Sequence, residues 1–163
     1  MIQAIQEQDW KEILEIQSDA YYEIIPESIS VLKSKWSLSP NTCFIYKENN
    51  KVLAYLLAHP WQENSAPDLN EELKEIKNSD GIFIHDLAIR KIEHQKGIGT
   101  KLYLHLENYA KQKQIRFFSL ISIQNSKAFW EQKGFYPVTI SKDLESYGKD
   151  AIYMKQILFN GIE

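Results

Sequence analysis

Residues 82–100 read IFIHDLAIRKIEHQKGIGT, and this stretch decides the fold. Its first eight residues are apolar nearly throughout, which predicts a strand at a central position of a sheet. A basic turn follows, and residues 97–113 then place Ile98, Leu102 and Leu106 on one side of an amphipathic helix. The sequence thus predicts a buried strand that leads through a short loop into the N-terminus of a helix.

Two glycines, Gly97 and Gly99, flank one residue where this helix begins. Because glycine has no Cβ atom, the backbone there can approach a ligand closely. The first N–H groups of a helix have no partners within it, and the helix dipole favours an anion. We therefore expect a phosphate or pyrophosphate site at this turn. A Walker A loop does not fit any window of the chain, and a dinucleotide fingerprint lacks its third glycine, since Leu102 stands there.

A second segment, residues 125–135, narrows the choice of ligand. It reads NSKAFWEQKGF and predicts a short helix that ends at Gly134. With this segment and with residues 94–99, HQKGIG, the chain resembles the GNAT superfamily of acyl-CoA-dependent N-acyltransferases. The loop motif of that family is Arg/Gln-x-x-Gly-x-Gly/Ala, and its second motif is Asn-x-x-Ala followed by Gly-Phe. The sequence departs from the family at His94, where Arg or Gln is usual, and at Trp130, where Tyr is common.

The resemblance implies a site for acetyl-CoA. The loop would cradle the pyrophosphate, the strand before it would splay at a bulge and pair with the pantetheine arm, and the helix from residue 125 would close the other side. The coenzyme A contacts implied in this way are Leu87, Ala88, Ile89, His94, Gln95, Lys96, Gly97, Ile98, Gly99, Thr100, Asn125, Phe129 and Trp130.

The catalytic groups are less well determined. In the family, the tyrosine at the position of Trp130 often protonates the departing thiolate. An indole cannot act as an acid, so the resemblance leaves Tyr136 or water as the proton donor. His85 and Asp86 lie on the strand expected to flank the thioester, and successive strand residues face opposite sides unless a bulge intervenes. We favour His85 as the general base because an imidazole ordinarily titrates near pH 6.5 (about neutrality). A packing role for both residues is the alternative.

The whole chain, residues 1–163, predicts one α/β domain of the GNAT fold. We expect a central mixed, partly parallel sheet of six to seven strands flanked by about four helices. Asp9 and Glu12 fit a capping box for the first helix, and residues 70–77 are a candidate short helix. The remaining expected elements are a helix at 27–36 and strands at 43–46, 52–59, 117–123, 135–140 and 151–158.

Composition limits the possible partners. The net charge is −3, so the basic excess of a general nucleic-acid binder is absent, and the longest apolar run has seven residues, from Val52 to Ala58. A single cysteine, Cys43, provides no disulfide framework and no cysteine-based metal cluster, and we expect a buried thiol, no metal, no membrane association and a cytoplasmic protein. Acidic residues gather in residues 60–80, and their field would favour a cationic amine.

These observations predict an N-acetyltransferase that moves an acetyl group from acetyl-CoA directly to an amine. The acceptor, a small molecule or a protein amine, is left open, as is acyl length. The family resemblance also allows a homodimer. The first alternative is a non-catalytic acyl-CoA-binding module or sensor on the same fold, which the tryptophan at position 130 favours. The second is an enzyme that uses a nucleotide as its phosphate ligand.

Overall fold

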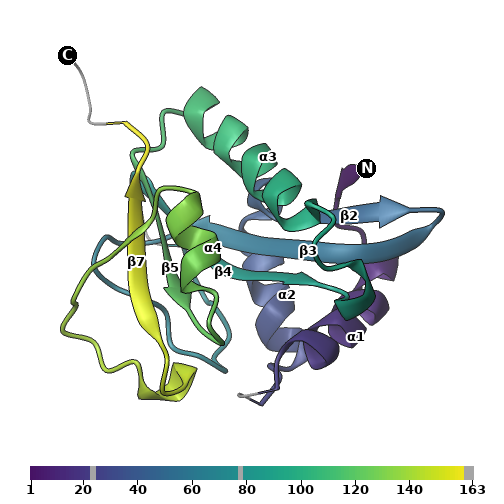
Figure 1. Ribbon diagram of the computed structural model, residues 1–163, viewed down its shortest axis with the longest axis horizontal. Coiled ribbons are helices and arrows are strands. Elements are labelled where there is room, and N and C mark those ends of the chain that lie inside the picture. The colour runs from purple at the N-terminus through teal and green to yellow at the C-terminus, as the bar shows by residue number, and fades with distance from the viewer. Residues whose placement is uncertain (23–24, 77–78, 160–163) are drawn as a thin grey trace.

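The computed structural model describes residues 1–22, 25–76 and 79–159, and these form a mixed seven-stranded sheet with helices on both faces (Figure 1). The strand order is β1-β2-β3-β4-β5-β7-β6, in which β4 and β5 pair in parallel and the other neighbours pair antiparallel. The strands are β1 Ile2–Ala4, β2 Phe44–Glu48, β3 Lys51–Pro60, β4 Gly81–Ile89, β5 Phe117–Ser122, β6 Tyr136–Pro137 and β7 Ile152–Ile157. The expected central strand is therefore confirmed as β4.

Four α-helices cover the sheet, two on each face. They are α1 Trp10–Ala20 and α2 Ile29–Leu38 on one face, and α3 Ile98–Gln112 and α4 Lys127–Gln132 on the other. Short 3-10 turns lie at η1 Glu7–Asp9, η2 Pro40–Thr42, η3 Lys91–Glu93 and η4 Glu145–Tyr147. The predicted α/β class, strand number and helix number are thus confirmed.

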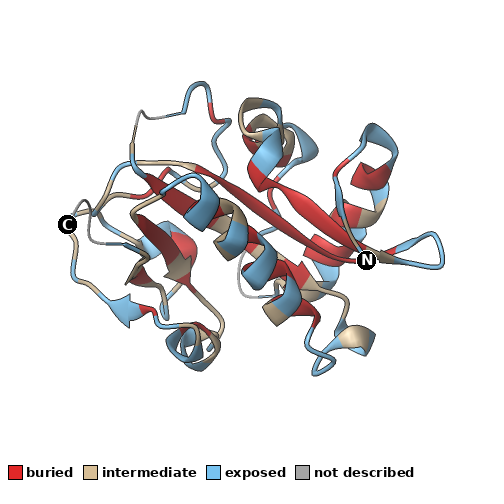
Figure 2. Ribbon diagram, turned by 90° about the horizontal axis from the view of Figure 1, so that it is seen from above, coloured by how far each residue is buried: buried red, intermediate tan, exposed pale blue. Residues whose placement is uncertain are grey.

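Each face of the sheet has its own apolar core. Leu102 and Leu106 of α3 pack with Leu56 of β3 on one face, as the helical spacing predicts. On the other face, Ile13 of α1 and Leu32 of α2 pack against the sheet. In Figure 2 the strands form a buried layer, while the outward sides of the helices are exposed. Residues of β4 pack in both cores, which matters because β4 supplies much of the site.

β4 contains a β-bulge at His85. Leu57 of β3 pairs with Asp86, but its neighbour Ala58 pairs with Ile84, so His85 has no partner on β3. A bulge of this kind inserts one residue and shifts the alternation of the side chains that follow.

The shift changes which residues of β4 face each core. Ile84 packs on the α3 side before the bulge, and Leu87 and Ile89 pack on that side after it. His85 and Asp86 therefore both turn toward the α1–α2 side, although they are adjacent in sequence. Without the bulge only one of the two side chains could face this side of the sheet, whereas with the bulge both do.

The ladder between β4 and β5 is short. Its register runs from the pair Gly81 and Phe117 to the pair Ile84 and Leu120, and then ends. Residues 85–89 have no ladder partner on β5 within the described part of the chain, so their edge diverges from β5. The splay expected from the family resemblance is thus present at the bulge.

Two local expectations are wrong. Asp9 does not cap α1 through its side chain, because its Oδ2 accepts the N–H of Gln6 at 2.8 Å, while Glu12 accepts the N–H of Val52 at 3.0 Å. Residues 70–76 form no helix, and residue 77 lies outside the described residues. Asp9 thus belongs to the 3-10 turn η1, which is a local alternative to the expected helix cap. In residues 70–76, the N–H groups of Asn70 and Leu73 bond to the side chains of Glu27 and Ser34, which are distant in sequence.

Candidate functional site

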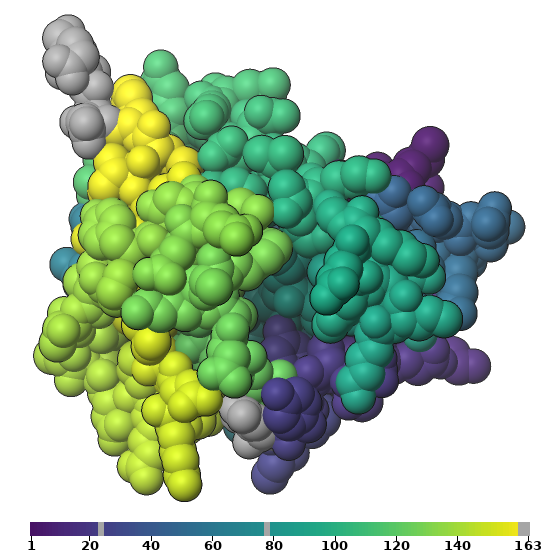
Figure 3. All heavy atoms as spheres, viewed as in Figure 1, coloured from purple at the N-terminus to yellow at the C-terminus, as the bar shows by residue number. Residues whose placement is uncertain are grey.

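A cavity of about 530 Å³ lies between the N-terminus of α3, the diverging edge of β4, β5 and α4. Figure 3 shows the hollow between the green surface of α4, the teal loop before α3 and the purple end of α1. Of the residues predicted from sequence, Lys96, Asn125 and Tyr136 do not line it. The predicted residues that do are His85, Asp86, Leu87, Ala88, Ile89, His94, Gln95, Gly97, Ile98, Gly99, Thr100, Phe129 and Trp130.

The glycine turn presents free backbone donors to this cavity. Gly97 precedes α3 with φ of 80°, a left-handed conformation that favours glycine, and a Cβ atom there would have nothing within 4 Å. The first bond of the helix joins the N–H of Lys101 to the carbonyl of Gly97 at 3.0 Å. The N–H groups of Ile98, Gly99 and Thr100 therefore have no partner within the helix, which suits an anion.

Gly99 serves a different purpose, because its surroundings are crowded. A Cβ atom on Gly99 would lie 3.0 Å from Cδ1 of Ile89 and 3.4 Å from Cζ of Phe129. The glycine thus allows the first turn of α3 to pack closely against β4 and α4. This close packing brings the N–H groups to the cavity wall.

Three basic residues around the turn have acidic partners in the protein. Lys96 lies 2.9 Å from Glu93, and a guanidinium nitrogen of Arg90 lies 3.0 Å from Glu12. Lys91 reaches Asp19 at 3.8 Å. The cradle therefore offers backbone N–H groups, with the paired cations at its rim.

His94 connects the turn to the end of β4. Its Nε2 donates to the carbonyl of Ile89 at 3.1 Å, since a carbonyl can only accept. His94 thereby holds the loop against the strand and still lines the cavity. The histidine that stands here in place of the family's usual Arg or Gln therefore has a structural role.

At the opposite end of the cavity, His85 is joined to Glu27, which lies in the segment between α1 and α2. The Nε2 of His85 lies 2.6 Å from Oε1 of Glu27, and their side chains are 2% and 5% exposed. The Nδ1 of His85 is buried and has no hydrogen-bond partner among the described residues. If Glu27 is ionised, Nε2 must carry the proton, and Nδ1 of a neutral ring is then a free lone pair.

Glu27 is held on every side. Its Oε2 accepts the N–H of Asn70 at 2.8 Å, and the amide of Gln17 bonds both the N–H and the carbonyl of Glu27 at 2.9 Å. Burial raises the pKa of Glu27, but His85, Lys35 and the Asn70 N–H outweigh it and lower the pKa to about 2. Glu27 is therefore a carboxylate at neutral pH, which fixes the tautomer of His85.

Asp86 accepts hydrogen bonds from two tyrosines. Tyr21 at the end of α1 donates to its Oδ1, and Tyr55 on β3 donates to its Oδ2 at 2.5 Å. Burial raises the pKa of Asp86 to about 6, although His85 and the two phenols lower it. Burial likewise raises the pKa of both phenols, so they remain donors.

Three residues considered from sequence take other positions. Tyr136 is 43% exposed on β6. Asn125 is exposed before α4, with φ of 62°, and Ser126 is the N-cap. Cys43 is fully buried, and burial raises the pKa of its thiol to about 12, which leaves too little thiolate for a nucleophile.

The acidic loop does not supply the negative charge of the cavity. Its Glu63 pairs with Arg116 and Lys155, and Asp68 pairs with Lys142. Among the described residues of the range 60–80, only Leu69 lines the cavity. The charge there comes from Glu27 and Asp86 instead.

This combination of a glycine turn, a bulged strand and a splayed sheet has a counterpart in a known family. The sequence profile of the acetyltransferase (GNAT) family matches residues 10–135. The chain belongs to this family. The match includes both glycines of the turn and extends through Phe135, so it covers the segments on which the resemblance was based.

Solved structures of GNAT proteins share the fold over nearly the whole chain. One is the ribosomal-protein-S18-alanine N-acetyltransferase from Escherichia coli, 18% identical, covering 100% of this chain and 96% of that chain with a TM-score of 0.70. Another is the GphF GNAT-like decarboxylase in complex with isobutyryl-CoA, at 12% identity, 97% and 99% coverage and a TM-score of 0.82. A third is Ard1 from Thermoplasma volcanium, at 14% identity, 98% coverage of both chains and a TM-score of 0.75. No curated protein matches the sequence.

Two further features of this GNAT protein concern metals and membranes. The described residues contain no group of three or more His, Cys, Asp or Glu side chains arranged to hold a metal ion. Among them, no helix has the length and apolar character needed to cross a bilayer.

Sequence reasoning missed several residues at the α1–α2 end of the cavity. Glu27, Gln17 and Tyr147 all line it. Glu27 is 58 residues away from His85 in sequence, and only its place at the start of a helix was visible. Tyr21 also lines the cavity, and its bond to Asp86 has no signal in the local sequence.

Proposed function

We propose that the protein is an N-acetyltransferase that transfers an acetyl group from acetyl-CoA to an amine in one step. The observation that carries this proposal is the single cavity that joins the glycine turn of α3 to the bulged edge of β4 and to the Glu27–His85 pair. One end of the cavity suits a pyrophosphate, and the other end holds a candidate base. The edge of β4 connects the two ends.

The turn and the strand edge position the acyl donor. The N–H groups of Ile98, Gly99 and Thr100 face a phosphate anion, and the free edge of residues 85–89 lies along the pantetheine arm. Phe129 and Trp130 of α4 form the opposite wall. Since coenzyme A carries its own reactive thioester, the protein contributes mainly orientation and electrostatic stabilisation.

His85 is the proposed base. An acceptor that binds as an ammonium first loses one proton through His85 to solvent. The neutral amine nitrogen then forms a bond to the acyl carbon, the carbon–sulfur bond breaks with its electron pair going to sulfur, and one further proton leaves the nitrogen. Glu27 keeps the proton of His85 on Nε2, so Nδ1 accepts the proton from the amine, directly or through one water. Glu27 then stabilises the imidazolium that results.

No protein acid is needed for the departing sulfur. Tyr136 does not line the cavity, and the indole of Trp130 is not an acid. A thiol of the cysteine type has a pKa of about 8.5, so the thiolate leaves readily without protonation. This accounts for a GNAT site in which Trp130 replaces the usual tyrosine.

The test is thiol release from acetyl-CoA with a panel of small amines and amine-bearing peptides. We expect release with at least one acceptor class, and loss of coenzyme A binding in Gly99→Val, because the added methyls clash with Ile89 and Phe129. The exposed substitution Leu104→Val is the matched control and should retain binding. Isobutyryl-CoA belongs in the donor panel, because a GNAT-like decarboxylase of this fold binds it. Tight coenzyme A binding with no release for any acceptor would instead identify a non-catalytic sensor.

A further inference from the structure

The charge of the cavity wall limits the kind of acceptor, and this inference rests on the proposed function. Among the described residues that line the cavity, the acids are Glu27 and Asp86, and there is no lysine or arginine. Both acids lie at the α1–α2 end, away from the phosphate turn. As far as the described residues form it, the acceptor end of the cavity therefore has negative side chains and no lysine or arginine.

Glu27 cannot easily turn away or lose its charge. Its two carboxylate oxygens are bonded to His85 and to the N–H of Asn70, and its backbone is bonded to Gln17. The oxygen that contacts His85 adjoins an imidazole whose Nδ1 has no partner in the described structure. A fixed carboxylate thus lies beside an unsatisfied proton acceptor, where a protonated amine would be bound and deprotonated.

Asp86 adds a second carboxylate to the same wall. Its oxygens are held by Tyr21 and Tyr55, and burial raises its pKa to about 6, so it is ionised at and above neutral pH. Lys35 of α2 lies near both acids, but it is fully buried, does not line the cavity and donates to the carbonyl of Glu71 at 3.3 Å. Lys35 offsets part of this negative charge, but it is not a lining residue. An anion in the cavity would therefore contact the carboxylates and not Lys35.

We propose that the acceptor is an amine with no anionic group beside the reacting nitrogen, and that Glu27 and Asp86 exclude free α-amino acids. A free amino acid has a carboxylate two bonds from its nitrogen, and this carboxylate would lie close to the carboxylates of Glu27 and Asp86. Like charges placed together across a desolvated contact are strongly unfavourable, and such repulsion gives specificity. Monoamines, polyamines and amines of peptides or amidated amino acids carry no such group and fit this wall.

Matched pairs of acceptors test the proposal. Phenylalanine is compared with phenylalaninamide, and tyrosine with tyramine, in the thiol-release assay with acetyl-CoA. We expect kcat/KM to be lower for the free acid by about 100-fold, as repulsion from two carboxylates implies. In Glu27→Gln the ratio between the two acceptors should narrow by about tenfold, whatever the loss in absolute rate, because one of the two repelling charges is removed.

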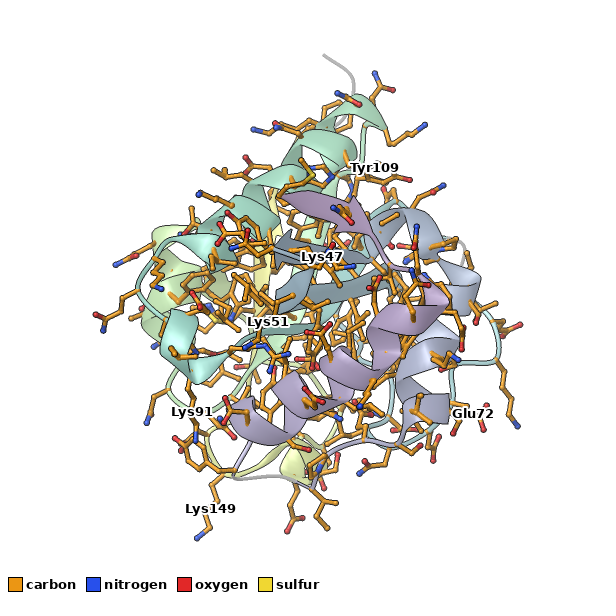
Figure 4. The ribbon with its side chains drawn as sticks, turned by 90° about the vertical axis from the view of Figure 1, so that its right-hand side faces the viewer. Lys47, Lys51, Glu72, Lys91, Tyr109 and Lys149 are labelled. Atoms are coloured by element: carbon orange, nitrogen blue, oxygen red, sulfur yellow. The ribbon has the colours of Figure 1, made fainter. Side chains whose placement is uncertain are left out.

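Glu72→Gln is the matched control, because it removes a carboxylate from the acidic loop without touching the cavity. Glu72 is exposed and projects from the edge of the molecule opposite Lys91, which precedes the glycine turn (Figure 4). The acid-to-amide ratio should be unchanged in this variant. Equal use of the free acid and the amide by the wild-type protein would overturn the proposal.

A binding measurement separates this proposal from the proposed function. If no amine releases thiol, the same pairs are titrated by calorimetry into the protein saturated with coenzyme A. Binding of phenylalaninamide and tyramine, with Kd values for the free acids at least tenfold higher, would support the exclusion of free amino acids even in a protein that does not acetylate. Free acids that bind as tightly as their partners, or no binding by either member of any pair, would refute it.

Discussion

At the residue scale, one hydrogen bond decides the chemistry assigned to the site. The ionised Glu27 accepts the Nε2–H of His85, and Nδ1 of the ring is the proposed base. Without Glu27 the imidazole would lose both its preferred tautomer and the anion that stabilises its charged form. The proposed role of His85 therefore depends on a residue from the segment between α1 and α2, which makes the pair the smallest functional unit.

Replacing His85 by glutamine should lower kcat by 100-fold or more. The expected size is that of general base catalysis, on the order of 10²–10⁴-fold. The measurement is kcat for thiol release by the wild-type protein and the variant. His105→Gln, an exposed imidazole on α3, is the control and should keep the wild-type kcat. An unchanged kcat in His85→Gln would assign the base to another group.

Asp86 gives a prediction about stability. Its folded pKa is raised to about 6, above the unfolded value of about 3.9. The folded protein therefore binds this proton more tightly than the unfolded chain, and the associated stability is present below about pH 4 and lost as the pH rises through 6. A shift of about two pKa units corresponds to roughly 2–3 kcal/mol.

Urea unfolding at pH 4.5, 6.0 and 7.5 measures this effect. In Asp86→Asn the group cannot ionise, so the variant should gain stability relative to the wild-type protein as the pH rises over this range. Asp150→Asn, at an exposed position, should follow the wild-type protein. A constant difference between Asp86→Asn and wild type at all three pH values would contradict the raised pKa.

At the scale of elements, the glycine turn and the bulge are what convert a sheet into a site. Gly97 and Gly148 both have positive φ, 80° and 106°, but only Gly97 lines the cavity. Alanine at either position should cost stability, about 1 kcal/mol or more, because the left-handed region disfavours a Cβ atom. Only Gly97→Ala should also weaken coenzyme A binding, since its methyl would project into open space beside the anion cradle.

The measurements for this pair are the free energy of unfolding and the Kd for coenzyme A. Gly148→Ala reports the cost of backbone strain alone. Equal loss of affinity in both variants would mean that strain, and not access to the turn, controls binding.

Elements with a strong local pattern were predictable, and contacts between them were not. The helix from Ile98 was predicted because its apolar residues recur at helical spacing, and β4 because eight consecutive residues are nearly all apolar. β1, only three residues long, has too few residues to show a pattern. The position of the bulge at His85 depends on its pairing with β3, and the Glu27 contact depends on how α1 and α2 pack. The glycine turn and the adjacent residues His85 and Asp86 were therefore visible in the sequence, whereas Glu27, which contacts His85 at the other end of the cavity, was not.

At the scale of the whole molecule, the stabilisation by a bound ligand should depend on whether the ligand contacts both halves of the sheet. α3 lies on the β3–β4 side, α4 lies beside β5 and β7, and the cavity spans the splay between these halves (Figure 1). A ligand that contacts both sides binds only the folded arrangement and so stabilises it by mass action. A ligand that contacts only the glycine turn would gain less.

Thermal unfolding with different ligands tests this cooperation and separates the remaining alternatives. At 100 times its Kd, acetyl-CoA should add about 2.7 kcal/mol, which for a chain of this size raises Tm by about 5–10 °C. Adenosine 3′,5′-bisphosphate, which lacks the pantetheine arm, should bind more weakly than coenzyme A, because it leaves the free edge of residues 85–89 uncovered. ATP and NAD should give no comparable shift, since the turn matches neither nucleotide motif. Stabilisation by ATP or NAD that equals that of acetyl-CoA would mean that the turn recognises phosphate alone, and the edge of β4 would then have no part in binding.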